Sequence, residues 1–117
     1  MVYVEQDRMS RKWGYQIIEN SGGAVRILSE SYHFLSPTEV FEFVGKIKAG
    51  EIKVNRDPET RSWGYVILIK NNPPYEEYGF DSSESVQSFI NDLNKAVQEG
   101  VKMKPNSFNN AVNMRIS

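Results

Sequence analysis

Hydrophobic and polar residues alternate along this chain in short stretches that are typical of half-buried β-strands. In the clearest of them, Trp13, Tyr15 and Ile17 alternate with small or polar residues, so one face of the strand is apolar. An Asn-Ser-Gly-Gly segment at 20–23 follows and predicts a hairpin turn. The predicted strands cover residues 2–4, 13–19, 25–33, 52–54, 63–70 and 75–79.

Two other stretches have the periodicity of amphipathic helices. The first begins with a capping box formed by Ser36 and Glu39, and Gly50 ends it. The second begins at residue 81 or 82 and ends at Gly100. The apolar stripes of the two helices consist of Val40, Phe43, Val44 and Ile47, and of Val86, Phe89, Ile90, Leu93 and Val97.

The two halves of the chain match when one is shifted against the other. "RKWGYQIIEN" at 11–20 and "RSWGYVILIK" at 61–70 align at a shift of 50 positions. Later matches, such as Phe43 with Phe89, align at a shift of 46, as a shortened hairpin in the second half would produce. We infer a single domain, 1–117, with an internal repeat at 1–50 and 51–101.

This pattern predicts an α+β fold of tandem duplicated βββα units, with an antiparallel sheet and one helix per unit packed on one face. Aromatic residues at matching positions are expected in the core of the repeat, and these are Trp13, Tyr15, Trp63, Tyr65, Phe43 and Phe89. Residues 102–117 form a tail that is either loose or an extra edge strand, because Val112, Met114 and Ile116 alternate with other residues.

Composition and charge narrow the function classes. The chain has 15 acidic and 14 basic residues, and its pI is about 5.8, whereas domains that hold a nucleic-acid backbone are usually basic. The absence of Cys excludes disulfides and thiol catalysis. No apolar run is long enough for a membrane span, and residues 1–8 lack the apolar segment of a secretory signal. We therefore expect a cytoplasmic protein.

Two stretches resemble known families. "WGYQIIENSGGAVRILSESYHFLSPTEVFEFVGKIK" and "WGYVILIKNNPPYEEYGFDSSESVQSFINDL" together resemble the YegP-like family of small bacterial proteins with tandem repeats. That resemblance implies the fold but no catalytic residues. "YEEYGFDSSESVQSFINDL" also resembles the end of the three-strand-plus-helix DNA-binding module of phage integrase arms. There, basic and aromatic residues of the sheet enter the major groove, whereas this stretch carries Glu76 and Glu77.

The candidate binding residues are few. Basic residues in the two turns predict an anion or nucleic-acid patch if both turns lie on one side, and these are Arg8, Arg11, Lys12, Arg56 and Arg61. His33 is the only His and has no Cys or acidic neighbours at the spacing of metal ligands. No phosphate loop or nucleophile elbow is present. We therefore expect no catalytic residue, no metal and no cofactor.

These observations favour a non-enzymatic protein-interaction module that presents a sheet face or its edge strands to another protein. Its size and composition are like those of phage or mobile-element inhibitors of host proteins, such as anti-CRISPR-type proteins. Edge strands also permit a homodimer. Two alternatives stay open: a nucleic-acid-binding module that uses the basic turns and sheet aromatics, and a small-ligand binder with a nucleotide pocket between the helices and the sheet.

Overall fold

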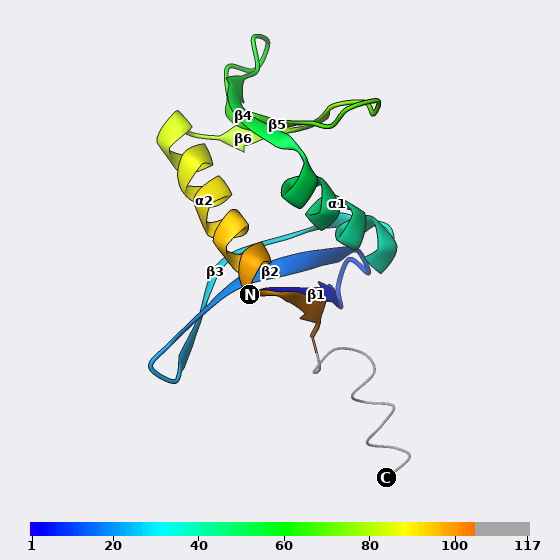
Figure 1. Cartoon of the computed structure of the whole chain (residues 1–117), viewed down its shortest axis with the longest axis vertical. Helices are drawn as coiled ribbons and strands as arrows, with labels where there is room; N and C mark the ends of the chain where they lie inside the picture. Colours follow the sequence, from blue (N-terminus) through cyan, green and yellow to red (C-terminus); the bar gives the residue numbers. More distant parts are fainter. Residues whose placement is uncertain (105–117) are drawn as a thin grey trace.

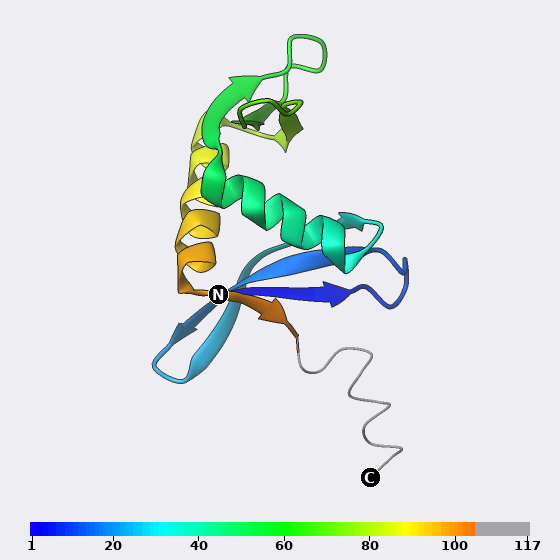
Figure 2. The ribbon, with the colours of Figure 1, turned by 45° about the vertical axis from the view of Figure 1, so that its right-hand side comes forward.

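Two small sheets with two helices between them form the molecule, as the computed structural model of residues 1–104 shows (Figures 1 and 2). Sheet A has the strand order β3-β2-β1-β7, and sheet B the order β4-β5-β6. The strands of sheet A are β1 (Val2–Gln6), β2 (Trp13–Ser21), β3 (Ala24–Phe34) and β7 (Val101–Met103). Those of sheet B are β4 (Glu51–Arg56), β5 (Trp63–Leu68) and β6 (Tyr75–Phe80). The helices are α1 (Pro37–Ala49) and α2 (Ser83–Glu99).

The α+β class is confirmed. The sequence did not decide between one continuous sheet and two packed sheets, and the structure shows two features that differ from a single antiparallel sheet. The strands divide between two sheets, and β7 pairs with β1 in parallel. The first difference arises because β4 begins at Glu51, directly after α1, and so starts a new sheet at the far end of this helix. The second arises because α2 returns the chain to the start of β1, where Val2 N–H donates to the Gly100 carbonyl (2.9 Å).

Both helices begin with a serine cap. Ser36 Oγ accepts from the Glu39 N–H (3.3 Å), and Ser82 Oγ accepts from the Ser85 N–H (3.1 Å). The Glu39 carboxylate accepts from the Leu35 N–H (3.2 Å), one residue before the cap. The serine half of the predicted capping box is therefore present. The Glu39 side chain, however, accepts from the N–H of Leu35 and not from that of the Ser36 cap.

The core lies between the two sheets, where the helices meet them. Two aromatic trios fill it, one of Tyr15, Phe34 and Phe43 and the other of Tyr65, Phe80 and Phe89. Tyr75 contacts a ring of each trio, because its centroid lies 5.2 Å from that of Phe43 and 6.3 Å from that of Tyr65. Ring packing of this kind adds to the energy of area burial, so the two halves share one core.

The six aromatic residues expected in the core differ in depth. Tyr15, Tyr65 and Phe43 are buried, whereas Trp13, Trp63 and Phe89 are partly exposed at its border. Val112, Met114 and Ile116 lie outside the described residues, and the strand that adds an edge to sheet A is β7. No helix within residues 1–104 is long and apolar enough to cross a membrane.

Candidate functional site

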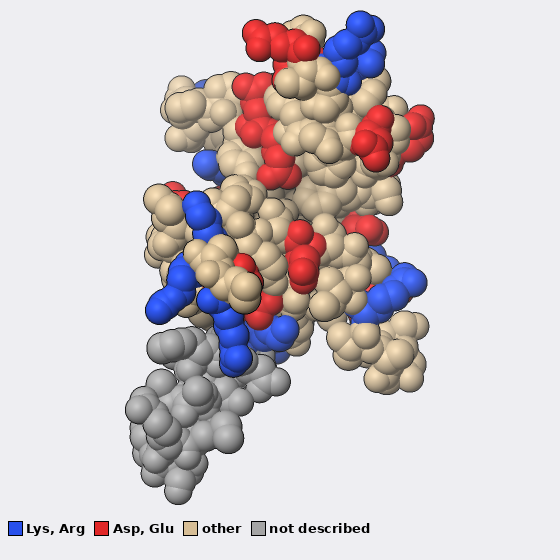
Figure 3. Space-filling view, turned by 180° about the vertical axis from the view of Figure 1, so that it is seen from behind, with Lys and Arg blue, Asp and Glu red and all other residues tan. Residues whose placement is uncertain are grey.

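The basic residues of the two turns do not form one patch. Arg8, Arg11 and Lys12 lie in the turn between β1 and β2, whereas Arg56 and Arg61 border the turn between β4 and β5. These turns lie at separate ends of the molecule (Figures 1 and 2). Figure 3 accordingly shows one group of Lys and Arg side chains at the sheet A end and another at the far tip of sheet B.

The turns themselves are built alike. The Arg11 N–H donates to the Asp7 carbonyl (2.9 Å), and the Arg61 N–H donates to the Asp57 carbonyl (2.8 Å). Each aspartate carboxylate also accepts from a hydroxyl three residues later, of Ser10 or Thr60, and these bonds lower the pKa of Asp7 and of Asp57. Both carboxylates therefore form hydrogen bonds within their own turns.

In the second turn, the Arg56 side chain also forms contacts within the protein. Arg56 Nε donates to the Arg61 carbonyl (3.0 Å), and the Arg56 guanidinium lies 5.4 Å from the centroid of the Trp63 ring. In the first turn, Gln6 takes the same place, because its Nε2 donates to the Arg11 carbonyl (2.9 Å). The two turns therefore present different side chains to a ligand.

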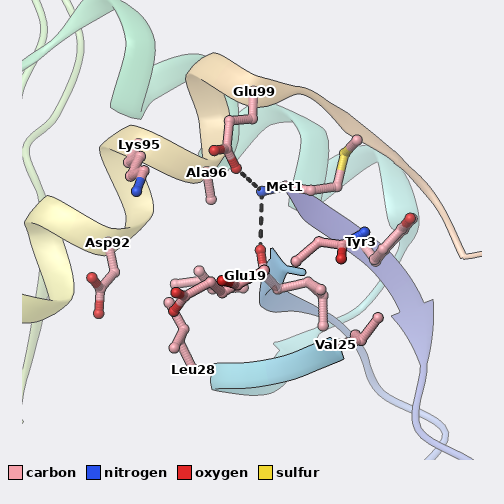
Figure 4. Close-up of a pocket in the computed structure, with 13 residues that line it drawn as sticks. Met1, Tyr3, Glu19, Val25, Leu28, Asp92, Lys95, Ala96 and Glu99 are labelled. Carbon is pink, nitrogen blue, oxygen red and sulfur yellow. Dashed lines mark hydrogen bonds and ion pairs between the residues drawn. The ribbon is translucent and has the colours of Figure 1, made fainter. Parts of the chain in front are cut away.

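A groove runs along the flank of α2 and meets the β2–β3 hairpin, and we call it the α2 groove (Figure 4). Its first part is a cavity of about 600 Å³ with an apolar floor that includes Ile17, Leu28 and Ala96. Asp92 and Lys95 lie on its helical side. The Met1 ammonium donates to Glu99 Oε1 (2.7 Å) and to the Ile18 carbonyl (3.2 Å), which attaches the start of β1 to both sides of the groove.

The α2 groove continues toward sheet B in a second cavity of about 510 Å³, which shares Leu28 and Asp92 with the first. Glu84 and Asp92 are the charged residues of this second part, and neither forms an ion pair with another described residue. Phe80 and Phe89 give it aromatic walls. This part of the groove is therefore apolar and acidic.

The strand beside the groove, β3, has a free edge. It is 11 residues long and forms one edge of sheet A, so its outer backbone groups pair with no strand of the described chain. Val25 and Ile27, near the tip of the hairpin, are 66% and 49% exposed. An exposed edge strand with apolar side chains is a ready site for pairing with another chain.

A polar cluster lies where the inner faces of the two sheets meet, and we call it the seam cluster. It consists of Tyr15 in β2, His33 in β3, Tyr65 in β5, and Tyr75 and Glu77 in β6. Tyr65 Oη donates to Glu77 Oε1 (3.2 Å), and His33 Nε2 lies 3.3 Å from Tyr75 Oη and 3.7 Å from Glu77 Oε2. The two contacts of His33 are the polar side-chain contacts that join sheet A to sheet B within residues 1–104.

Burial dominates the acid–base chemistry of the seam cluster. It raises the pKa of Tyr15, Tyr65 and Tyr75 well above that of an ordinary tyrosine, and the negative charge of Glu77 raises it further. All three hydroxyls are therefore protonated at neutral pH. Tyr15 Oη is buried and has no hydrogen-bond partner among the described residues.

A second polar network covers the outer face of sheet A. Tyr32 Oη donates to Glu5 Oε2, Lys104 Nζ donates to Gln16 Oε1 (3.1 Å), and Gln16 Nε2 donates to Glu30 Oε2 (3.0 Å). Every member has a partner, so this network holds the strands in register. No three His, Cys, Asp or Glu side chains of residues 1–104 come together as metal ligands.

Comparison with protein-family models, curated proteins and solved structures finds no match to this chain. The sequence left open a nucleotide pocket between the helices and the sheet, but it identified neither the lining of the α2 groove nor the contacts of the seam cluster. His33 was noticed only as a lone residue, because its partners Tyr75 and Glu77 come from a different sheet. The sequence signal for Glu77 is slight: it stands at an inward position of β6, opposite Tyr65, where an apolar residue is expected.

Proposed function

We propose that this chain is a small non-enzymatic protein-interaction module that binds an extended segment of a partner protein at the free edge of β3. The observation that carries this proposal is the unpaired 11-residue edge strand with Val25 and Ile27 exposed beside the α2 groove. Backbone hydrogen bonds to the edge supply affinity, and alternate side chains of the added strand enter neighbouring cavities. Such a strand places every second side chain toward Leu28 and Asp92.

The charge of the α2 groove indicates the chemistry of the partner segment. Glu19, Glu84, Asp92 and Glu99 line it, against Lys95 and the Met1 ammonium. Glu19 pairs with Arg26 (2.8 Å) and Glu99 with Met1 (2.7 Å), so Glu84 and Asp92 against Lys95 decide the remaining charge. Because this balance is acidic, a segment of alternating apolar and basic residues complements it best.

Selection from a library of random peptides displayed on phage tests this proposal. We expect recovered peptides to alternate apolar residues with Lys or Arg. A Val25→Lys/Ile27→Lys variant should bind the corresponding synthetic peptides about tenfold more weakly in biolayer interferometry, because edge charges oppose strand pairing. The matched control is Leu68→Lys, which replaces another exposed apolar residue (39% exposed) in sheet B. Equal binding by both variants would sink the proposal.

We also propose that the chain is a tandem duplication of a βββα unit, of the kind seen in the YegP-like family. The order β1-β2-β3-α1 recurs as β4-β5-β6-α2, and the two aspartate turns share their hydrogen bonds. The aromatic trios occupy matching positions as well. From the size and composition of the chain, we further propose that it acts as a phage or mobile-element inhibitor, and that the bound partner is a host protein.

Nucleic-acid binding is the second candidate, because Lys and Arg side chains gather at the sheet A end (Figure 3). It predicts salt-sensitive binding of labelled oligonucleotides in fluorescence anisotropy, since each phosphate contact adds about 0.9 to the log–log slope. An Arg8→Gln/Lys12→Gln variant should lower that slope, while Arg56→Gln at the other end should not. Absence of binding at low salt would eliminate this candidate.

A further inference from the structure

One segment outside the described residues has a sequence that suits the free edge of β3. Residues 111–117 read "AVNMRIS", in which Val112, Met114 and Ile116 alternate with polar residues, one of them Arg115. Alternation with a period of two is typical of a strand that has one apolar face. The segment carries one basic residue and no acidic one. It therefore has the apolar and basic character that complements the α2 groove.

The edge of β3 offers a matching surface to each face of such a strand. On the inner face of sheet A, the second part of the α2 groove has aromatic walls of Phe80 and Phe89. On the outer face, Glu30 is exposed and belongs to β3 itself, and its Oε2 accepts from Gln16 Nε2. A strand that pairs with β3 can therefore direct its apolar side chains into the groove and Arg115 toward the Glu30 carboxylate.

The length and exposure of β3 also suit a segment of this size. Strands are usually about 5–6 residues long, so a seven-residue segment can pair along its whole length with the 11 residues of β3. Pairing would satisfy the outer backbone groups of β3. It would also remove the apolar side chains of Val25 and Ile27 from water, and these are now 66% and 49% exposed.

The 111–117 segment of the same molecule is poorly placed to reach this edge. β7 and β3 form opposite edges of sheet A, so a strand added beyond β3 lies four strand spacings from β7, or about 19 Å. The chain from Lys104 to Ala111 covers at most about 25 Å when fully extended. Because the helices cover the inner face, this connection has to cross the side chains of the outer face (Figure 2). A nearly straight connection is entropically costly, whereas a second molecule has no such restriction.

We propose that the 111–117 segment of a second copy pairs with the free edge of β3, so that two molecules exchange these segments. This inference rests on the proposed function of the edge and adds that the chain itself supplies one ligand for it. Reciprocal exchange closes as a two-fold dimer. A second copy at the edge competes with a partner protein, so self-association lowers the apparent affinity for that partner.

Sedimentation equilibrium of the full-length chain over a range of concentrations measures the association. The wild-type chain should form dimers. A segment variant, Met114→Lys/Ile116→Lys, and an edge variant, Val25→Lys/Ile27→Lys, should each associate at least about tenfold more weakly. The reason is that the first variant places charges on the apolar face of the segment, and the second places them on the edge that receives it.

A control and a mixture show where the contact lies. Asn109→Lys/Asn110→Lys adds the same two charges just before the segment and should dimerise as the wild type does. The segment variant keeps an intact β3 edge, and the edge variant keeps an intact 111–117 segment. An equimolar mixture of these two variants should therefore associate more strongly than either does alone, through one of the two exchanged contacts.

Three results would overturn the proposal. The first is a wild-type chain that stays monomeric up to about 1 mM. The second is a segment variant that dimerises like the wild type, because two β3 edges would then pair directly with each other. The third is a mixture that associates no more than its components.

Binding of the phage-selected peptides separates this failure from failure of the proposed function. If these peptides bind the wild-type chain and lose affinity in the edge variant while no dimer forms, the edge binds partner proteins and the 111–117 segment is not among its ligands. If the peptides bind the edge variant as well as they bind the wild type, the proposed function itself is wrong.

Discussion

At the scale of single residues, two glycines set how closely neighbouring strands approach. A Cβ on Gly14 would overlap the Ser31 carbonyl oxygen, and one on Gly64 would overlap the Glu77 carbonyl oxygen and the Tyr78 ring. Neither glycine has a positive φ, so the requirement is for space and not for an unusual backbone conformation. Both stand beside a register shift between their strand and the next one.

Replacement of either glycine by alanine should therefore destabilise the fold. We expect Gly14→Ala and Gly64→Ala each to lower the free energy of unfolding by about 2–3 kcal/mol, because the added methyl group pushes two strands apart. Gly45→Ala is the control: Gly45 is exposed in α1, no atom lies within 4 Å of the added Cβ, and alanine favours helix by about 1 kcal/mol. Urea denaturation followed by circular dichroism measures all three. A stable Gly14→Ala variant would contradict the packing argument.

The sequence indicated only in part that Gly14 and Gly64 allow the close approach of neighbouring strands. The recurrence of Gly14 and Gly64 beside Trp and Tyr in "RKWGYQIIEN" and "RSWGYVILIK" could be read directly from the sequence. The atoms that the glycines approach could not be predicted, because Ser31 and Glu77 are brought near by strand pairing at a distance. For the same reason, Tyr15 was predicted as a core residue, while its unpartnered hydroxyl could not be foreseen.

At the scale of elements, the two turns that join β1 to β2 and β4 to β5 share one strained feature. Arg11 has a φ of 65° and Arg61 a φ of 66°, in the left-handed region that side chains with a Cβ disfavour. Each residue is fixed there by its N–H bond to the carbonyl of Asp7 or Asp57. In both turns, an arginine therefore occupies a backbone conformation that glycine adopts at a lower energetic cost.

Substitution of these arginines by glycine should stabilise the protein. Arg11→Gly and Arg61→Gly should each raise the free energy of unfolding by about 0.5–1 kcal/mol, because relief of strain exceeds the greater entropy of glycine in the unfolded chain. Arg8→Gly in the first turn is the control, since φ of Arg8 is not positive and only the entropic loss remains. Thermal unfolding distinguishes the two directions. If all three variants lose stability, the arginine side chains themselves support the turns.

Elements with local signals were predictable, and elements that depend on distant partners were not. Ser36 and Gly50 bound a helix that the structure begins at Pro37 and ends at Ala49, because caps and periodicity act within a few residues. The three residues of β7 have too little pattern to identify a strand, and they pair with β1 only because α2 ends beside Val2. The division into two sheets likewise depends on where α1 ends, because β4 begins directly after it, at the far end of the helix from sheet A.

At the scale of the whole molecule, the two sheets depend on each other through what lies between them. α2 packs against strands of both sheets, and Tyr75 joins the two aromatic trios. The seam cluster then places three tyrosine hydroxyls around one carboxylate at the centre of this arrangement. Loss of either sheet would expose these groups, so we expect the halves to unfold together.

The alkaline limit of stability tests this arrangement. Because burial raises the pKa of Tyr15, Tyr65 and Tyr75 in the folded state, the folded chain holds these protons to a higher pH than the unfolded chain, whose tyrosines ionise near about pH 10. Their stabilising contribution is therefore complete below about pH 10 and is lost as the pH rises above it. We expect one cooperative unfolding transition above this pH, in which circular dichroism and tyrosinate absorbance change together for the buried tyrosines.

Variants reveal whether the three hydroxyls cause this loss of stability at alkaline pH. Tyr65→Phe and Tyr15→Phe each remove one proton whose binding differs between the two states, so the dependence of stability on pH should become less steep by one proton in each. The two should differ at neutral pH. Tyr15→Phe removes a hydroxyl without a partner and should stabilise the fold by about 1 kcal/mol, whereas Tyr65→Phe removes a donor to Glu77 and should destabilise it by a similar amount. If the buried tyrosines ionise in steps while the far-ultraviolet spectrum stays native, the sheets open at the seam without unfolding, and the two halves are not one cooperative unit.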